Sequence, residues 1–213
     1  MTTSFWFNVT IEVGTVGTAQ TVTAISKANP GVVTHDGASL SEGGYALLVT
    51  SGMPQVNNRV VRALNATVSP SEFEMDELDS SNFSTFTSGT VAPVTFSLTL
   101  STITNVTPSG GDPEFDDTTL VHSNQRTQAV TLTSPFTVTM ESLWDPSDST
   151  LVALKTAADT NSPRACRITF GSGARSAFYA DIGFAFLAAG TVPGKVVTTI
   201  TFSAKGLSSN WTD

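Results

Sequence analysis

The sequence predicts a mainly β protein, and three observations support this. The 213 residues are rich in Thr, Ser and Gly, which favour strands and turns, and only 13% are charged. Several long segments alternate apolar with small polar residues, as a strand with one buried face does. One segment alone has the pattern of a helix. A weakly charged surface has few groups that oppose association, so we also expect contacts between copies of the chain.

The N-terminal region predicts a strand at residues 5–13, where every second residue from Phe5 onward is apolar. Residues 14–17 contain two glycines and are expected to turn the chain. A second strand is expected at residues 21–26, where Thr and Val are frequent.

Residues 22–92 have a different texture, with short apolar runs and frequent turn signals. Asn29-Pro30-Gly31 and His35-Asp36-Gly37 are two of these signals. Five or six short strands at such close spacing predict a small β-barrel.

The middle of the chain predicts one long strand followed by a long loop. Residues 93–105 alternate apolar residues with Thr or Ser, whereas residues 106–128 are polar and contain Pro108, Gly110 and Gly111. A loop of this length within a compact domain is more often functional than not. We expect it to act as an arm that reaches a neighbouring copy. Its acidic group is Asp112, Glu114, Asp116 and Asp117.

The last third predicts a strand at residues 136–143 and the helix at about 146–158. Asp145 is expected to cap the helix and Pro146 to occupy its first position. Leu151, Leu154 and Ala158 would face the core. Three further strands are expected at residues 164–170, 175–187 and 195–205. The predicted fold is a β-sandwich or open barrel with one packed helix, together with the small barrel.

The sequence predicts no catalytic site, metal or cofactor. His35 and His122 lie in turn-rich segments without a nucleophile motif, so we expect both to be solvated. Cys166, the single cysteine, falls within an apparent strand and is expected to be a core residue. Acidic residues also cluster at Glu72, Glu74, Asp76, Glu77 and Asp79. Neither this cluster nor the one at residues 112–117 has the spacing of a calcium loop, and the chain has no glycine-rich phosphate loop.

The compartment and the electrostatics can also be predicted. A lone cysteine forms no intrachain disulfide, which suits a reducing cytoplasm. The N-terminal residues lack a signal-peptide pattern, and no apolar run is long enough to span a membrane. The net charge of -8 argues against tight binding to a phosphate backbone.

Several ordered motifs in the C-terminal part resemble a known family. They are WDPSD, the helix LVALKTAA, the strand RACRITF with its GSG turn, YADIG, and a final VTTITFSAKG. FDDTT at residues 115–119, with Arg126, extends the set. This order resembles the major tail tube protein of long-tailed, non-contractile (siphovirus-type) phages. The resemblance covers residues 1–20 and 93–213.

Residues 21–92 are similar to a second module, a small β-barrel found in phage tail proteins. That module is related to the first catalytic-cysteine half-domain of ubiquitin-activating enzymes. The similar segments are ISKANPGVVT, LSEGGY, VTSGMPQVNNR and DSSNFSTFTSG, although the HDG turn replaces the usual His-Gly. The stretch has no cysteine, so no ubiquitin-type chemistry follows. Together the resemblances imply a tube domain, residues 1–20 and 93–213, interrupted by a decoration domain at 21–92.

The tail-tube resemblance implies a structural virion protein that is made in the cytoplasm of a bacterial host. Six copies would form a ring, and stacked rings would form the channel for ejection of phage DNA, which passes without specific binding. Implied partners are the tape measure, tail terminator and tip proteins. Contacts between rings would involve Asp112, Glu114, Asp116, Asp117 and Arg126. The channel charge would come from Asp116, Asp117 and Glu141.

Two other classes remain open. One is a phage decoration protein or a receptor- or glycan-binding module that uses residues 21–92. The other is a small hydrolase, for which the sequence offers no catalytic set. Formation of rings or tubes would distinguish the tube protein from both.

Overall fold

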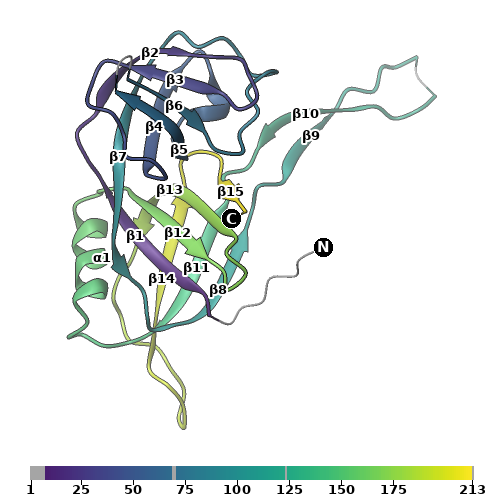
Figure 1. Ribbon diagram of the computed structural model, residues 1–213. Helices are drawn as coiled ribbons and strands as arrows, with labels where there is room; N and C mark the ends of the chain where they lie inside the picture. The colour runs from purple at the N-terminus through teal and green to yellow at the C-terminus, as the bar shows by residue number, and fades with distance from the viewer. Residues whose placement is uncertain (1–7, 69–70, 123, 213) are drawn as a thin grey trace.

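Strands make up most of the chain in the computed structural model, which describes residues 8–68, 71–122 and 124–212 (Figure 1). The strands are β1 (Thr10–Val16), β2 (Gln20–Ile25), β3 (Val32–His35), β4 (Tyr45–Ser51), β5 (Arg59–Val68), β6 (Ser71–Met75), β7 (Ser88–Thr99), β8 (Ile103–Ser109), β9 (Pro113–Asp117), β10 (Gln128–Thr133), β11 (Thr137–Leu143), β12 (Arg164–Thr169), β13 (Arg175–Gly183), β14 (Val197–Ala204) and β15 (Ser209–Trp211). The helices are the 3-10 turn η1 (Pro54–Val56) and α1 (Ser149–Asp159).

Most of the strands belong to one antiparallel sheet. Its order is β2-β3-β6-β5-β4-β7-β1-β12-β13-β14-β11-β8, with β15 paired to β13. β2 also pairs with β7, which closes the first six strands into a barrel. The first part of β7 pairs with β2 and β4, and its second part pairs with β1. One strand therefore runs through both parts of the molecule.

The barrel has its own hydrophobic core. The core includes Val33, Leu48, Met53, Phe73 and Met75, each at most 1% exposed. The chain enters and leaves the barrel side by side, because Gln20 and Val91 are register partners on β2 and β7.

The remaining strands surround a second core. β1, β12 and β13 form one side, β14, β11 and β8 form the other, and α1 packs against β13 (Figure 1). The core includes Val13, Met140, Leu154, Phe178 and Phe202. Alternate residues of these strands are buried, as the period of two requires. The predicted mainly β fold with one packed helix and a small barrel is confirmed.

The helix cap is Asp148, so the prediction of Asp145 is wrong. The Asp148 carboxylate accepts the backbone N–H groups of Thr150 (2.8 Å) and Leu151 (3.4 Å). Asp145 instead accepts the backbone N–H (2.8 Å) and hydroxyl (2.6 Å) of Ser147. The chain makes one more turn before the helix begins, because Asp148 N–H donates to the Asp145 carbonyl oxygen.

Several predicted strand boundaries are also wrong. The strand predicted at residues 93–105 is divided between β7 and β8, because Leu100 turns into the core and donates its N–H to the Ile11 carbonyl oxygen. β13 ends at Gly183, and Phe186 beyond it has a φ of +58°. The first strand lies at Thr10–Val16, and residues 1–7, with Phe5 and Phe7, lie outside the described residues.

Candidate assembly surfaces

A β-hairpin arm projects from the body of the molecule (Figure 1). β8 leads into β9 and β10 leads into β11, so the arm extends the β8–β11 pair. At the bend, Gly110 and Gly111 have φ values of +81° and +83°. A Cβ on Gly110 would lie 2.5 Å from the Pro135 carbonyl oxygen, so glycine is required there. The long loop predicted at residues 106–128 is therefore wrong, because strands occupy much of it.

The charged residues predicted to contact a neighbouring ring all lie on this arm. They are Asp112, Glu114, Asp116, Asp117 and Arg126. Hydrogen bonds from the Thr119 side chain and backbone N–H lower the pKa of the Asp117 carboxyl group. Arg126 Nη2 lies 3.4 Å from Asp117 Oδ2, with the side chains 86% and 44% exposed. An ion pair this exposed contributes little to folding, so Asp117 and Arg126 could exchange it for contacts with a neighbouring copy at little cost.

The arm also exposes apolar side chains that sequence reasoning missed. Phe115 and Val130 face each other across β9 and β10 and are 59% and 61% exposed. Leu120 and Val121, near the end of the arm, are 74% and 97% exposed. A lone two-stranded ribbon is marginally stable in water, and exposed apolar groups of this kind mark interaction sites. The arm therefore has the character of a docking element.

A second surface is the outward face of β8, β11 and β14, which we call the polar face. Thr139 lies between Thr107 of β8 and Thr201 of β14, and Glu141 lies between Asn105 and Thr199 in the same register. Ser109 and Thr137 share a hydroxyl hydrogen bond of 2.7 Å. Buried residues of β11 and β14 point the opposite way. The polar face thus presents hydroxyl and amide groups with one carboxylate.

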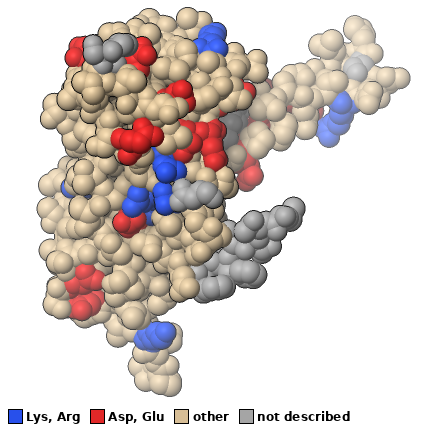
Figure 2. Space-filling model, in the orientation of Figure 1, with Lys and Arg blue, Asp and Glu red and all other residues tan. Residues whose placement is uncertain are grey.

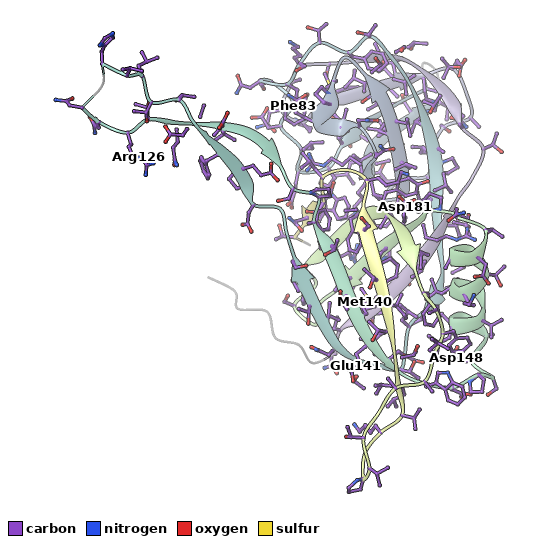
Figure 3. All side chains as sticks on the ribbon, turned by 180° about the vertical axis from the view of Figure 1, so that it is seen from behind. Phe83, Arg126, Met140, Glu141, Asp148 and Asp181 are labelled. Carbon is purple, nitrogen blue, oxygen red and sulfur yellow. The ribbon has the colours of Figure 1, made fainter. Side chains whose placement is uncertain are left out.

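The structure separates the residues predicted to give the channel its charge. Glu141 lies on β11 in the polar face, far along the chain ribbon from Arg126 on the arm (Figure 3). Asp116 and Asp117 lie on β9 of the arm, where Asp117 pairs with Arg126. Asp181 of β13, which sequence reasoning missed, borders the polar face through its register partner Ser203. Its carboxylate pairs with Lys205 Nζ at 3.2 Å.

The free edge of the sheet lies next to the polar face. In the described part of the chain, β8 pairs with β11 on one side and has no partner on the other. A cleft of about 610 Å³ runs beside it, lined by residues 8–11, 99–101 and 103–106. An unpaired edge exposes backbone N–H and C=O groups that can accept a strand from another chain.

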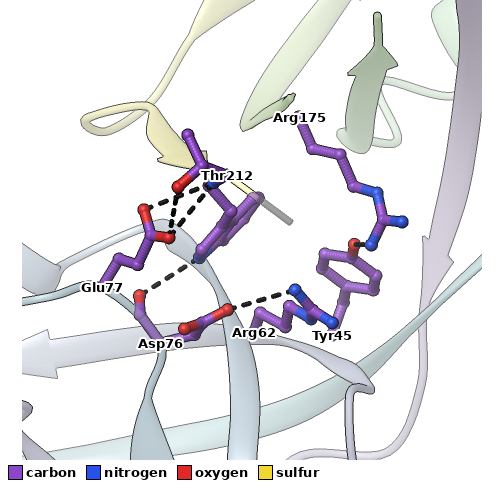
Figure 4. Close-up of polar contacts among 7 residues, drawn as sticks. Tyr45, Arg62, Asp76, Glu77, Arg175 and Thr212 are labelled. Atoms are coloured by element: carbon purple, nitrogen blue, oxygen red, sulfur yellow. Dashed lines mark hydrogen bonds and ion pairs between the residues drawn. The ribbon is translucent and has the colours of Figure 1, made fainter. Parts of the chain in front are cut away.

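The C-terminal strand fastens the barrel to the rest of the molecule (Figure 4). Trp211 Nε1 donates to the Asp76 carbonyl oxygen at 3.2 Å. The Thr212 hydroxyl donates to Glu77 Oε1 at 2.7 Å. Arg62 pairs with the Asp76 carboxylate at 3.3 Å. The contacts of Trp211 and Thr212 join the C-terminal segment to the residues that follow β6, and the Arg62 ion pair lies within the barrel.

Aromatic packing strengthens the same junction. Tyr45 from the barrel contacts the rings of Phe96 and Trp211, with centroids 5.3 and 5.5 Å apart. The Arg167 guanidinium lies over the rings of Tyr45 (4.8 Å) and Phe96 (4.4 Å) and pairs with Glu12. The barrel thus contacts the rest of the molecule through a shared cluster of buried residues.

Charged side chains gather unevenly on the surface. Figure 2 shows acidic side chains over the lower part of the barrel and basic ones just beneath them. The hairpin between β13 and β14, residues 184–196, carries Lys195 as its one charged residue. Most of the molecular face shown in Figure 2 carries neither acidic nor basic side chains.

The single cysteine and the two histidines lie in different parts of the fold, on β12, on β3 and on the arm. Cys166 is fully buried, and burial raises the pKa of its thiol. His35 is 4% exposed, so its predicted solvation is wrong, whereas His122 lies exposed on the arm. Among the described residues, no group of His, Cys, Asp and Glu could hold a metal ion. None of the described helices has the length and hydropathy of a membrane span.

Comparison with known proteins identifies the family. A family model described as phage tail tube protein, TTP, matches residues 51–212. No curated protein matches the chain at a significant level. The match spans the arm, the polar face and the C-terminal strand, as well as much of the barrel, and covers most of the chain. The chain therefore belongs to the phage tail tube protein family, whose members are structural proteins of the virion tail.

Proposed function

We propose that this tail tube protein forms hexameric rings that stack into a tube, with the polar face lining the channel. The composition of that face carries the proposal. A surface that binds DNA presents several Lys or Arg to the phosphates. The polar face instead presents Thr, Ser and Asn side chains with Glu141 among them. Such a lining stays hydrated and repels phosphate weakly, so DNA passes during ejection without specific binding.

The free edge supports closure of the ring. Pairing of β8 with a strand of the adjacent copy would satisfy its exposed backbone groups and continue the sheet around the channel. A cyclic arrangement uses one pair of complementary surfaces in every subunit and leaves no unpaired edge.

The arm is suited to join one ring to the next. Its exposed Phe115 and Val130 would become buried against the neighbouring copy. Asp112, Glu114 and Arg126 would add polar contacts at that boundary. Asp116 and Asp117 would add negative charge where the rings meet, and Glu141 would supply it within each ring.

Residues 21–92 are proposed as an outer decoration domain on a siphovirus-type tail. The adjacent entry and exit of the chain at Gln20 and Val91 support an inserted unit. Other proposed partners are the tape measure protein inside the tube and the terminator and tip proteins at its ends. Synthesis would take place in the cytoplasm of the bacterial host.

Electron microscopy of the purified protein tests the assembly. We expect rings with six-fold symmetry and tubes that grow as the protein concentration rises. A protein that stays monomeric at all concentrations and binds host cells or glycans would support a receptor-binding module instead.

The channel lining can be tested by adding positive charge to it. Thr139→Lys places six added positive charges around each hexameric ring, so its tubes should retain DNA at low salt and release it at high salt. Thr85→Lys, on an exposed loop of the barrel, is the matched control and should retain little. Equal DNA retention by the two variants would place the polar face outside the channel.

A further inference from the structure

Two complementary features lie at opposite ends of β14. The β13–β14 hairpin, residues 184–196, projects from one end of the sheet (Figure 1). A cleft of about 670 Å³ lies at the other end, which we call the base cleft. β14 begins at Val197 beside the hairpin and ends at Ala204 in the wall of the cleft. Eight residues of strand separate the two features by roughly 25 Å.

The hairpin exposes apolar side chains on a fixed support. Leu187 is 74% exposed, Val192 fully exposed and Val196 50% exposed. Its base is held by paired hydrogen bonds between Ala189 and Val197, both 2.8 Å. Trp144 Nε1 also donates to the Phe186 carbonyl oxygen at 3.2 Å. A projection of this kind is preorganised, so little ordering entropy opposes its binding.

The base cleft offers a matching lining. Its walls include Pro54, Arg59, Pro135, Phe136, Ala204 and Leu207. Leu207 is an apolar side chain left 51% exposed. The Arg59 guanidinium donates to Ser209 Oγ (2.8 Å) and the Gln55 carbonyl oxygen (3.3 Å), and no described carboxylate pairs with it. Its remaining N–H groups suit backbone carbonyl oxygens of an apolar turn.

We propose that the β13–β14 hairpin of one copy seats in the base cleft of the copy in the next ring. The inference rests on the proposed function, because it supplies a second contact between stacked rings. The contact joins two different surfaces, so it repeats without closing and produces a filament along β14. Gly111, Ser134 and Pro135 at the base of the arm also line the cleft, so the hairpin contact would adjoin the arm.

The hairpin carries no acidic residue, and Lys195 is its one charge. The arm of a neighbouring copy is the alternative occupant, because its acidic side chains could pair with Arg59 and Lys205 in the cleft. The apolar content of the lining and the position of the hairpin at the opposite end of the same strand favour the hairpin. An experiment must therefore separate these two occupants.

Disulfide trapping separates them in the full-length protein. Native Cys166 is buried, so exposed cysteines can be introduced without interference. Tubes grown from an equal mixture of Val192→Cys and Leu207→Cys proteins should give a disulfide dimer on mild oxidation. Neither variant alone should do so. A dimer from Val121→Cys mixed with Leu207→Cys, and none from the first mixture, would assign the cleft to the arm and overturn the proposal.

A charge variant gives a second measurement. Val192→Lys should raise the protein concentration needed for tube formation by at least about tenfold, because the added ammonium group would be buried in a cleft that already holds Arg59 and Lys205. Rings should still form, since Val192 is fully exposed in the single copy. Val152→Lys, on the outward side of α1, is the control and should form tubes normally. Normal tubes from Val192→Lys would overturn the hairpin contact, whereas absence of rings in the unmodified protein would overturn the proposed function.

Discussion

Within the barrel, neither ring nitrogen of His35 has a hydrogen-bond partner among the described residues. Burial lowers the pKa of this imidazole, and the nearby Asp36 carboxylate opposes that shift to a smaller extent. The unfolded chain therefore takes up a proton near pH 6.5, whereas the folded barrel takes it up only at lower pH. The free energy of unfolding should fall as the pH drops below about 6.5.

His35→Leu should flatten this decline, because the unfolded variant no longer binds the extra proton. Urea unfolding of the unassembled protein at several pH values between about 7 and 5 measures the slope. His122→Leu, exposed on the arm, should keep the slope of the unmodified protein. Identical slopes for all three proteins would assign the acid sensitivity to other groups.

The helix cap gives a second prediction for a single residue. Asp148→Ala should lower the free energy of unfolding by about 1 kcal/mol, because two N–H groups of α1 lose their acceptor. The corresponding fall in Tm is about 2–4 °C for a chain of this size. Asp145→Ala, which alters an exposed turn, should cost less in a thermal melt. A larger effect at Asp145 would contradict the assignment of the cap.

Residue patterns predicted burial where the period of two was clear. Ile200 and Phe202 alternate with Thr on β14, and both are fully buried. Asp145 and Asp148 could not be separated, since both are acceptors before an apolar run and the choice depends on one backbone turn. The burial of His35 escaped prediction, because the Asp-Gly that follows indicates a turn but not which way the histidine faces.

At the level of elements, the arm shows why a strand can escape sequence analysis. Regular alternation marks a strand only when one of its faces is buried in the same chain. In β9, both faces are exposed, so Phe115 is surrounded by Glu114 and Asp116 without a buried row. The strands with a buried face, such as β11, followed the predicted pattern closely. The acidic residues predicted to make contacts do lie on the arm. The apolar pair Phe115 and Val130 could be recognised only from the pairing register of β9 and β10.

The double variant Phe115→Ser with Val130→Ser tests the arm as an element. Both side chains are exposed in the single copy, so the Tm of the unassembled protein should change little. If a neighbouring copy buries them, tube formation should need a concentration at least about tenfold higher. Sedimentation of assembled protein measures this. Arg126→Ala, which removes only an exposed ion pair, is the control and should have a small effect. An unchanged concentration for the double variant would contradict docking through the arm.

At the scale of the whole molecule, the sequence predicted a tube domain and an inserted barrel, and the structure adds how they are joined. β7 passes through both, and the junction buries Tyr45, Leu47 and Val60 of the barrel against Val94 and Trp211. A buried cluster formed by segments far apart in the sequence cannot be recognised from any one of those segments. That the tube domain can assemble without the barrel therefore remains a prediction, and the loss of this cluster sets the expected stability of the shortened protein.

Deletion of residues 22–91 should leave tubes that still form. The polar face, the free edge of β8, the arm and the β13–β14 hairpin all lie outside the deleted segment. Thr21 and Ala92 can be joined by a short turn, because Gln20 and Val91 are paired in the sheet. The shortened protein should be less stable, since Trp211 loses its packing against Tyr45 and its hydrogen bond to Asp76. Its tubes should also need a higher protein concentration, because Pro54 and Arg59 no longer line the base cleft.

Electron microscopy of the shortened protein should then show an unchanged channel and a loss of outer density. Folded subunits that fail to assemble would make the barrel part of the assembling fold, and density lost from the channel side would place the barrel within the tube.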